Sequence, residues 1–405
     1  MPIKKLTPEL IAEFQSVIGP DIAAATVITN LNQDRPTATY FSDLVKNLPS
    51  ITIGEAGQVS VQISKRKSQT NAILKSAIGE GSYGQIYVNL AGVNVYKKIY
   101  LEGEGDPVVL EEKIREVFLE SFVQTVLSRD TSYGANVTRI EGMYRENPET
   151  RTAKAGDVVL YIKMETVAMT KDKYLESLLA TSPGGVKFKP MKRLLLQLAS
   201  LLDHFGKNYG FFHRDLHTGN VMFDASNNVK LIDFGRACMK LKDSATNKEI
   251  TYSIVSENVL AQPANVGAGS RLEPAIVGAA CFSYDFLIYL SALCDVKDKA
   301  KYEPATYTKL HNLLTQEDGL NLFDYWEANK KNKKDPTYWQ MYPDTVPTWE
   351  NKKVKVDGVD YKLTPQTTAI ASPSKMLTTL ATMEGGSRRN TRRNRTRRGT
   401  RKSRF

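Results

Sequence analysis

The segment from residue 211 to 223, FFHRDLHTGNVMF, gathers polar and charged side chains between apolar flanks. Asp215 and Asn220 lie five positions apart, and Asp233 follows thirteen positions after Asn220, beyond the apolar stretch VKLI. A hairpin through this stretch would bring Asp233 back beside Asn220. The sequence therefore predicts two oxygen ligands for a hard cation such as Mg²⁺ and one free carboxylate, Asp215, that can accept a proton from a hydroxyl group.

A glycine-rich stretch, GEGSYG, lies upstream and contains Gly79, Gly81 and Gly84. It fits a turn between two strands, where the absence of side chains lets backbone amides approach phosphate groups. The same spacing also opens dinucleotide-binding units, but no helix is predicted after Gly84, which counts against that alternative.

A lysine follows in the next predicted strand. Lys97 is two positions from both Val95 and Ile99, so the three share one face, and we expect Lys97 to point into a cleft while Lys98 points to solvent. Together, a phosphate cradle, a cation, metal ligands and a carboxylate are what phosphoryl transfer from ATP requires.

The cleft lysine needs a carboxylate partner. Residues 108–129 carry apolar side chains at helical spacing, and Glu112, Glu116 and Glu120 form one stripe along this predicted helix. Glu120 is the favoured partner and Glu116 the second, because the apolar residues that follow Glu120 anchor the remaining turns to the core. A solvated acidic stripe is the alternative interpretation.

The joined segment HRDLHTGNVMFDASNNVKLIDFGRA resembles the catalytic loop and DFG element of the eukaryotic protein-kinase-like superfamily. The glycine loop, the lysine strand and the helix glutamate are similar to the nucleotide site of that family, and the resemblance covers residues 72–300. It implies an α+β bilobal fold, with a small antiparallel β-sheet lobe plus one helix and a larger, mainly helical lobe.

The resemblance also implies residue roles. Asp215 would be the base, Asn220 and Asp233 the Mg²⁺ ligands, Lys97 with Glu120 the holder of the ATP phosphates, and Asp285 the buried brace of the catalytic loop. The residues that would surround the adenine are Ile78, Ile86, Val95, Met222 and Ile232, with Met164, Glu165 and Val167 in the hinge. His213 is expected to be structural.

Two features depart from the family pattern. His217 stands where serine/threonine kinases usually have a lysine, and the form DxHxGN is more similar to aminoglycoside and choline kinases and to UbiB-type kinases. His217 is expected to donate a hydrogen bond to the γ-phosphate; the alternative is that it only shapes the loop. No APE motif follows the DFG element, which leaves protein substrates open to question.

Arg214 favours a protein kinase, because an arginine before the catalytic aspartate can pair with a phosphate on the activation segment. The candidate acceptors of that phosphate are Ser244, Thr246, Thr251, Tyr252, Ser253 and Ser256.

Element prediction and composition divide the chain into four parts. We expect an N-terminal extension over residues 1–70, helical from 8 to 32 and with two strands in 50–64, then the small lobe over 71–167 and the large lobe over 168–345. Residues 346–405 are predicted to be a linker and a disordered basic tail.

The net charge of +11 lies almost entirely in that tail, which holds ten of the 55 basic residues; the other 45 nearly balance 44 acidic ones. The tail could bind nucleic acid or an acidic partner, or act as a nuclear address or a solubilising end. Similar tails occur in giant DNA viruses, which would place the protein in a host cell or virion.

Three separated cysteines are expected to be thiols, and no apolar run is long enough for a membrane span. These features favour the cytoplasm or nucleus.

The leading hypothesis is an ATP- and Mg²⁺-dependent serine/threonine protein kinase. One alternative is a small-molecule phosphotransferase that acts on a hydroxyl group. A second is a catalytically silent nucleotide-binding module, which the presence of Lys97, Asp215, Asn220 and Asp233 together disfavours.

Overall fold

The computed structural model describes most of the chain. The described residues are 3–32, 39–53, 58–64, 67–73, 79–81, 84–88, 94–102, 106–147, 157–253, 285–324, 353–356, 358–362 and 372–383. Ile78, Ser256, the region of the missing APE motif and the basic tail lie outside them.

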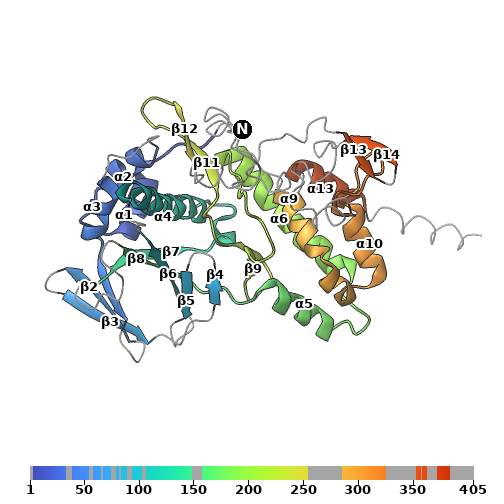
Figure 1. The fold of residues 1–405 in the computed structure, drawn as a ribbon, viewed down its shortest axis with the longest axis horizontal. Helices are drawn as coiled ribbons and strands as arrows, with labels where there is room; N and C mark the ends of the chain where they lie inside the picture. The colour runs from blue at the N-terminus through green and yellow to red at the C-terminus, as the bar shows by residue number, and fades with distance from the viewer. Residues whose placement is uncertain are drawn as a thin grey trace, which may run out of the picture.

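The small lobe is built on an eight-stranded sheet with the order β3-β2-β1-β7-β8-β6-β5-β4 (Figure 1). All neighbours are antiparallel except β1 and β7, which are parallel. The strands are β1 (Ser50–Ile53), β2 (Gln58–Ser64), β3 (Lys67–Ile73), β4 (Gly79–Gly81), β5 (Gly84–Val88), β6 (Asn94–Leu101), β7 (Ile140–Glu146) and β8 (Val158–Glu165). The predicted antiparallel small lobe is therefore confirmed.

A long helix, α4 (Pro107–Ser128), crosses this sheet and corresponds to the helix predicted over 108–129. Asp106 caps its first turn by accepting a hydrogen bond from the Val108 amide at 2.8 Å, and Pro107 occupies the first helical position. Thirteen of its 22 residues are buried, on all sides of its second half. A helix buried all round needs covering layers on more than one side.

Three short helices provide the second covering layer: α1 (Pro8–Ile18), α2 (Ala24–Leu31) and α3 (Tyr40–Asn47). They surround α4 on the side away from β6 (Figure 1), and their apolar faces belong to the same core as that of α4. Residues 1–70 were expected to be an N-terminal extension. In the structure, α1–α3 share the main core with α4, and β1–β3 are hydrogen-bonded strands of the small-lobe sheet, so this part of the chain is built into the small lobe.

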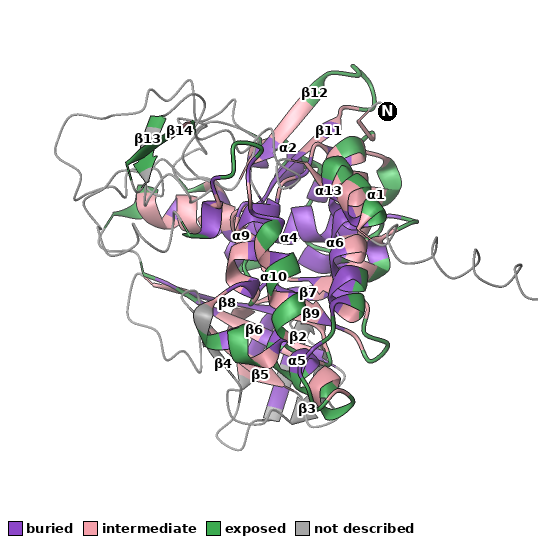
Figure 2. Cartoon of the chain, turned by 90° about the vertical axis from the view of Figure 1, so that its right-hand side faces the viewer, coloured by how far each residue is buried: buried purple, intermediate pink, exposed green. Residues whose placement is uncertain are grey.

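The large lobe is mainly helical. It contains α5 (Lys171–Ala180), α6 (Phe188–Tyr209), α9 (Asp285–Leu293) and α10 (Pro304–Asn312). Two hairpins, β9 (Val221–Phe223) with β10 (Val229–Leu231) and β11 (Cys238–Lys242) with β12 (Glu249–Ser253), follow α6. The amphipathic α6 buries one complete side (Figure 2), as expected for a helix that packs at the centre of a lobe.

The packed structure continues past residue 345. Helix α13 (Pro373–Thr382) buries Met376 and Leu380 in the main core and packs against α6. A short hairpin, β13 (Lys353–Val356) with β14 (Val359–Lys362), precedes it. The region 346–405 is therefore not a linker throughout, because the apolar face of α13 packs against α6.

Two further findings concern the cysteines and membrane association. Cys238 is disulfide-bonded, so the expectation of three thiols was wrong for this residue, whereas Cys294 is a buried free thiol. Within the described ranges, no helix combines the length and apolar character that a bilayer span requires.

A buried carboxylate joins the N-terminus, α4 and α6. The Asp130 side chain is fully buried and accepts hydrogen bonds from Lys4 Nζ at 2.7 Å, the Tyr209 hydroxyl at 2.9 Å and the Ser132 and Tyr133 amides at 2.9 Å. His204 Nε2 lies 3.0 Å away. Burial alone would raise the pKa of Asp130, but these donors, led by Lys4, more than offset it and hold the pKa well below its usual range.

We expect Asp130→Asn to lower the free energy of unfolding by about 2 to 4 kcal/mol at pH 7, because it removes a charged acceptor from donors that stay buried. The lowered pKa makes this stabilisation fully present above the unfolded-state pKa of about 3.9, and it is lost as the pH falls through the folded-state value. Urea unfolding between pH 7 and pH 2 should therefore show a difference from wild type that is constant above about pH 5 and narrows below about pH 4.

Asp43→Asn is the control, because Asp43 forms an exposed ion pair with Lys46. It should change the stability little at any pH. A gap between Asp130→Asn and wild type that widens on acidification would contradict the assignment.

Candidate active site

The loop after α6 is fixed by a carboxylate from another helix. Asp285, the first residue of α9, accepts hydrogen bonds from the His213 amide at 3.0 Å and the Arg214 amide at 2.9 Å. His213 is fully buried, and its Nε2 lies 3.0 Å from the Ile232 carbonyl oxygen. Arg214 has a φ of 67°, an unfavourable conformation for a residue with a side chain. Asp285 therefore stabilises the backbone from which Asp215 projects.

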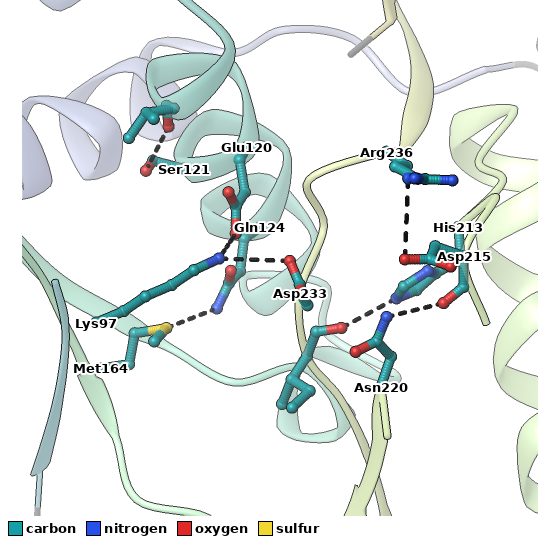
Figure 3. A network of polar contacts seen from close by, with 12 residues as sticks. Lys97, Glu120, Ser121, Gln124, Met164, His213, Asp215, Asn220, Asp233 and Arg236 are labelled. Atoms are coloured by element: carbon teal, nitrogen blue, oxygen red, sulfur yellow. Dashed lines mark hydrogen bonds and ion pairs between the residues drawn. The ribbon is translucent and has the colours of Figure 1, made fainter. Parts of the chain in front are cut away.

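The predicted hairpin is present and brings the two candidate metal ligands together. β9 pairs antiparallel with β10, and the Ile232 amide donates to the Asn220 carbonyl at 3.1 Å, so Asp233 returns beside Asn220 (Figure 3). Asn220 is buried, and its Nδ2 donates to the Asp215 carbonyl at 2.8 Å. This bond fixes the amide orientation and leaves Oδ1 as its ligand atom.

Three charged side chains meet beneath the sheet (Figure 3). Lys97 Nζ lies 2.8 Å from Glu120 Oε1 and 3.4 Å from Asp233 Oδ1. Lys97 comes from β6 and Glu120 from α4, whereas Asp233 follows β10. The structure thus brings the lysine to the favoured glutamate.

The charges of this cluster depend on one another. Burial by itself would lower the pKa of Lys97, but the carboxylates of Glu120 and Asp233 more than offset it and raise the pKa well above its usual value. Burial also acts to raise the pKa of Asp233, yet the Lys97 ammonium holds it below its usual value. For Glu120, burial is the largest effect and raises the pKa, and the negative charge of Asp233 raises it further; together they outweigh the lowering by Lys97. Lys97 is therefore charged, and Asp233 stays ionised as a metal ligand must.

Asp215 is flanked by two basic side chains. His217 Nε2 lies 3.9 Å and Arg236 Nε 4.0 Å from Asp215 Oδ2. The Gly219 amide donates to His217 Nδ1 at 3.0 Å, so the neutral ring carries its proton on Nε2. A Cβ at Gly219 would lie 2.7 Å from the His217 ring, so only glycine permits this arrangement.

Arg236 was not anticipated from the sequence. It follows the DFG element, but no spacing rule connects it with Asp215, and only the turn after Asp233 brings them together. Its guanidinium places a positive charge beside Asp215.

The sheet supplies the nucleotide side of the site. Gly79, Gly81 and Gly84 lie in the β4–β5 hairpin, where Gly81 pairs with Gly84. On the neighbouring strands, Ile86 pairs with Lys97, and Val95 with Met164. The glycine hairpin thus lies beside the strand that carries the cleft lysine.

The predicted hinge follows β8. Met164 Sδ lies 3.6 Å from Gln124 Nε2, and Glu165 forms an ion pair with Lys230. Val167 is half-buried. Met222 and Ile232, from the β9–β10 region, are also half-buried, as an adenine-binding surface before nucleotide binding would be.

The donor set fits Mg²⁺. Asn220 offers an amide oxygen and Asp233 a carboxylate, and Mg²⁺ in nucleotide sites takes few protein oxygens, with water and phosphate completing its octahedron. Among the residues that the structure describes, no cluster of three His, Cys, Asp or Glu side chains could hold a metal ion by itself.

The proposed phosphate-binding arginine faces one of the candidate hydroxyls. Arg214 Nη1 donates to the Ser253 Oγ at 2.9 Å. Ser244 instead bonds the Leu6 carbonyl, and Thr246 bonds Asp243. Of the described candidates, Ser253 is the one in contact with Arg214.

The two lobes, with a lysine-carboxylate cluster between them and a braced loop below, define a bilobal α+β architecture. The model of the protein kinase domain family matches residues 72–270. This match and the matches to curated kinases support a protein-kinase-like domain over residues 72–270.

Curated relatives agree with this family. The chain is 27% identical over 221 residues to the CTD kinase subunit alpha of Saccharomyces cerevisiae, a match that covers 52% of this chain and 37% of that protein. It is 26% identical to cyclin-dependent kinase 1 of Encephalitozoon cuniculi, with 39% and 47% covered, and 26% identical to a probable serine/threonine-protein kinase of Bifidobacterium longum, with 38% and 22% covered. The matched regions span less than half the length of each of these relatives.

We expect Asp285→Asn to lower turnover strongly with a smaller change in the KM for ATP. The amide would turn one of the two acceptor oxygens into a donor that faces a buried N–H group, which costs about 1 to 3 kcal/mol. The two amides that Asp285 accepts from belong to the catalytic loop, so nucleotide binding should be less affected.

Steady-state kinetics of phosphoryl transfer and thermal unfolding of the same preparations would test this. Asp295→Asn is the matched control, since Asp295 lies after α9 and its carboxylate accepts a bond from the Lys297 amide. If Asp285→Asn lowered only the unfolding temperature and kept normal turnover at low temperature, this would argue against a role of Asp285 in positioning the loop.

Proposed function

We propose that this protein transfers the γ-phosphate of ATP, with Mg²⁺, to a serine or threonine hydroxyl of a protein substrate. The observation that carries this proposal is the contact of one ammonium, Lys97, with both Glu120 and Asp233, above a loop that presents Asp215. A relative named as a probable serine/threonine-protein kinase supports the substrate class.

The proposed reaction is a displacement at the γ-phosphorus of ATP. The substrate hydroxyl oxygen attacks the γ-phosphorus, the bond from that phosphorus to the β–γ bridging oxygen breaks, and ADP leaves. Asp215 orients the hydroxyl and accepts its proton. Mg²⁺, when bound at Asn220 and Asp233, would neutralise charge on the phosphate oxygens.

The remaining groups bind and position. Lys97 would hold the α- and β-phosphates, with Glu120 keeping its ammonium in place, and the Gly79–Gly84 hairpin would offer backbone amides to the phosphates. His217, whose Nδ1 accepts from the Gly219 amide, would donate a hydrogen bond from Nε2 to the transferred phosphate. Ile86, Val95, Met222 and Ile232 would contact the adenine.

His217 favours a second candidate, a small-molecule hydroxyl acceptor, because DxHxGN occurs in kinases of that kind. The silent nucleotide-binding module is the third. Binding of nucleic acid or an acidic partner by the basic tail, and location in the cytoplasm, the nucleus or a virion, remain predictions.

We expect Asp215→Asn to lower turnover by about 10² to 10⁴, the usual contribution of a positioned general base, with little change in nucleotide affinity. Lys97→Met should lower turnover by at least about 10² because it removes the cation from the phosphates. Transfer of labelled phosphate from ATP to a mixed peptide and metabolite panel would measure both.

Lys98→Met is the matched control, because Lys98 is adjacent in β6 but contacts Glu146 at 3.9 Å and the Tyr161 ring instead of Glu120 and Asp233. Wild-type rates in Lys97→Met would show that the catalytic lysine is another residue. Labelled metabolites without labelled peptides would select the second candidate. ATP binding without transfer to any acceptor, Lys97-dependent or not, would select the silent module.

A further inference from the structure

The position of Glu120 depends on what covers the opposite side of α4. Phe118 and Phe122 lie two residues before and after Glu120, and a step of two residues turns a helix by about 200°. Both rings therefore lie on the face opposite to Glu120. They are fully buried. Their ring partners come from the N-terminal helices and, for Phe122, also from Tyr252 in β12.

Aromatic contacts fix this face. The rings of Phe14 in α1 and Phe122 are 5.2 Å apart at an interplanar angle of 68°, and those of Phe41 in α3 and Phe118 are 5.7 Å apart. The first pair is edge-to-face, a preferred geometry for aromatic rings, and the second is tilted at 48°. Helices α1 and α3 thus pack on α4 directly behind the glutamate.

Two charged residues of α4 bind the ends of these helices. Glu111 is 1% exposed and accepts hydrogen bonds from the Phe41 amide, the Ser42 amide at 2.9 Å and the Ser42 hydroxyl at 2.7 Å, all in the first turn of α3. One turn further on, Arg115 donates at 2.7 Å to the carbonyl of Leu31, the last residue of α2. A carboxylate at a helix N-terminus and a guanidinium at a C-terminus are both favourable.

The residues that precede α1 contact β11, the strand that follows Asp233. The Leu6 amide donates to the Lys242 carbonyl at 2.8 Å, and the Lys242 amide to the Lys4 carbonyl at 2.9 Å, so residues 4–6 extend along β11. Lys4 in addition contacts the buried Asp130. The N-terminus therefore lies beside β11 and α6 (Figure 1).

From these contacts we infer that residues 3–32 and 39–47 are a built-in clamp, an intramolecular positioning unit for the catalytic cluster. The clamp holds α4 and β11 so that Glu120 and Asp233 meet at Lys97. It lies before residue 72, where the match to the kinase domain begins. Glu111 is its principal positioning residue, and this role rests on the proposed function for its effect on catalysis.

A double-mutant cycle would test the clamp in the full chain. Glu111→Gln should lower turnover about tenfold in the wild-type background and less than about twofold in a Glu120→Gln background, because residues that act through one another are not additive. Ser42→Ala, which leaves both amide bonds to Glu111 in place, should give a smaller effect in the same direction and keeps the test available if Glu111→Gln does not fold.

Amide hydrogen exchange provides a readout that does not need activity. Glu111→Gln should accelerate exchange over residues 116–124, and Glu112→Gln, the same change at the next position of α4, should not. Additive losses of turnover in the cycle, or unchanged exchange around Glu120, would overturn the clamp. If exchange changes as expected while no variant or wild type transfers phosphate, the clamp stands and the proposed function fails.

The β11 side of the clamp has its own matched pair. Lys4→Met removes a 2.7 Å ion pair to a fully buried carboxylate, and Lys46→Met removes a 2.7 Å pair between exposed partners. Exchange in β11 should accelerate in Lys4→Met alone. Equal protection of β11 in both variants would restrict the clamp to α4.

Discussion

A single ammonium group holds two carboxylates that come from distant parts of the chain, and the arrangement of both lobes depends on it. Glu120 and Asp233 would repel each other without Lys97, and burial already raises the pKa of Glu120. The attraction is realised only when α4 and the connection after β10 are in place at the same time. A group of this kind couples the positions of two elements, because removing either carboxylate changes the charge balance felt by the other.

The backbone around the site is held in conformations that it would not adopt alone. Arg214 and Asp233 have φ values of 67° and 58°, and neither is glycine. Such residues persist only where the surrounding structure over-determines them. Asp285 accepts hydrogen bonds from the His213 and Arg214 amides, and Lys97 binds the Asp233 side chain. These contacts stabilise the two strained positions, Arg214 and Asp233.

Local patterns were sufficient for much of the fold and of the site. Strand alternation placed Lys97, helical spacing placed Glu120, and the spacing from Asn220 to Asp233 required a hairpin that β9 and β10 form. These inferences worked because each depends on a short period within one element. The contact of Arg236 with Asp215, the packing of α13 on α6 and the disulfide at Cys238 depend on which distant surfaces meet, and a single sequence does not specify that.

The N-terminal helices illustrate the same limit and its physical origin. Helical structure was predicted over residues 8–32, but the helix at Tyr40–Asn47 and the partner of the apolar faces were not, and residues 1–70 were expected to be an N-terminal extension. The sequence of α4 indicates why these helices pack there. Residues such as Phe118, Phe122 and Val126 make α4 apolar on more sides than one sheet can cover. Such a helix would expose a large apolar surface without a second layer, so a covering unit had to be supplied. Because that unit presses on the face opposite Glu120, the requirement to bury α4 and the requirement to position its glutamate are met by the same contacts.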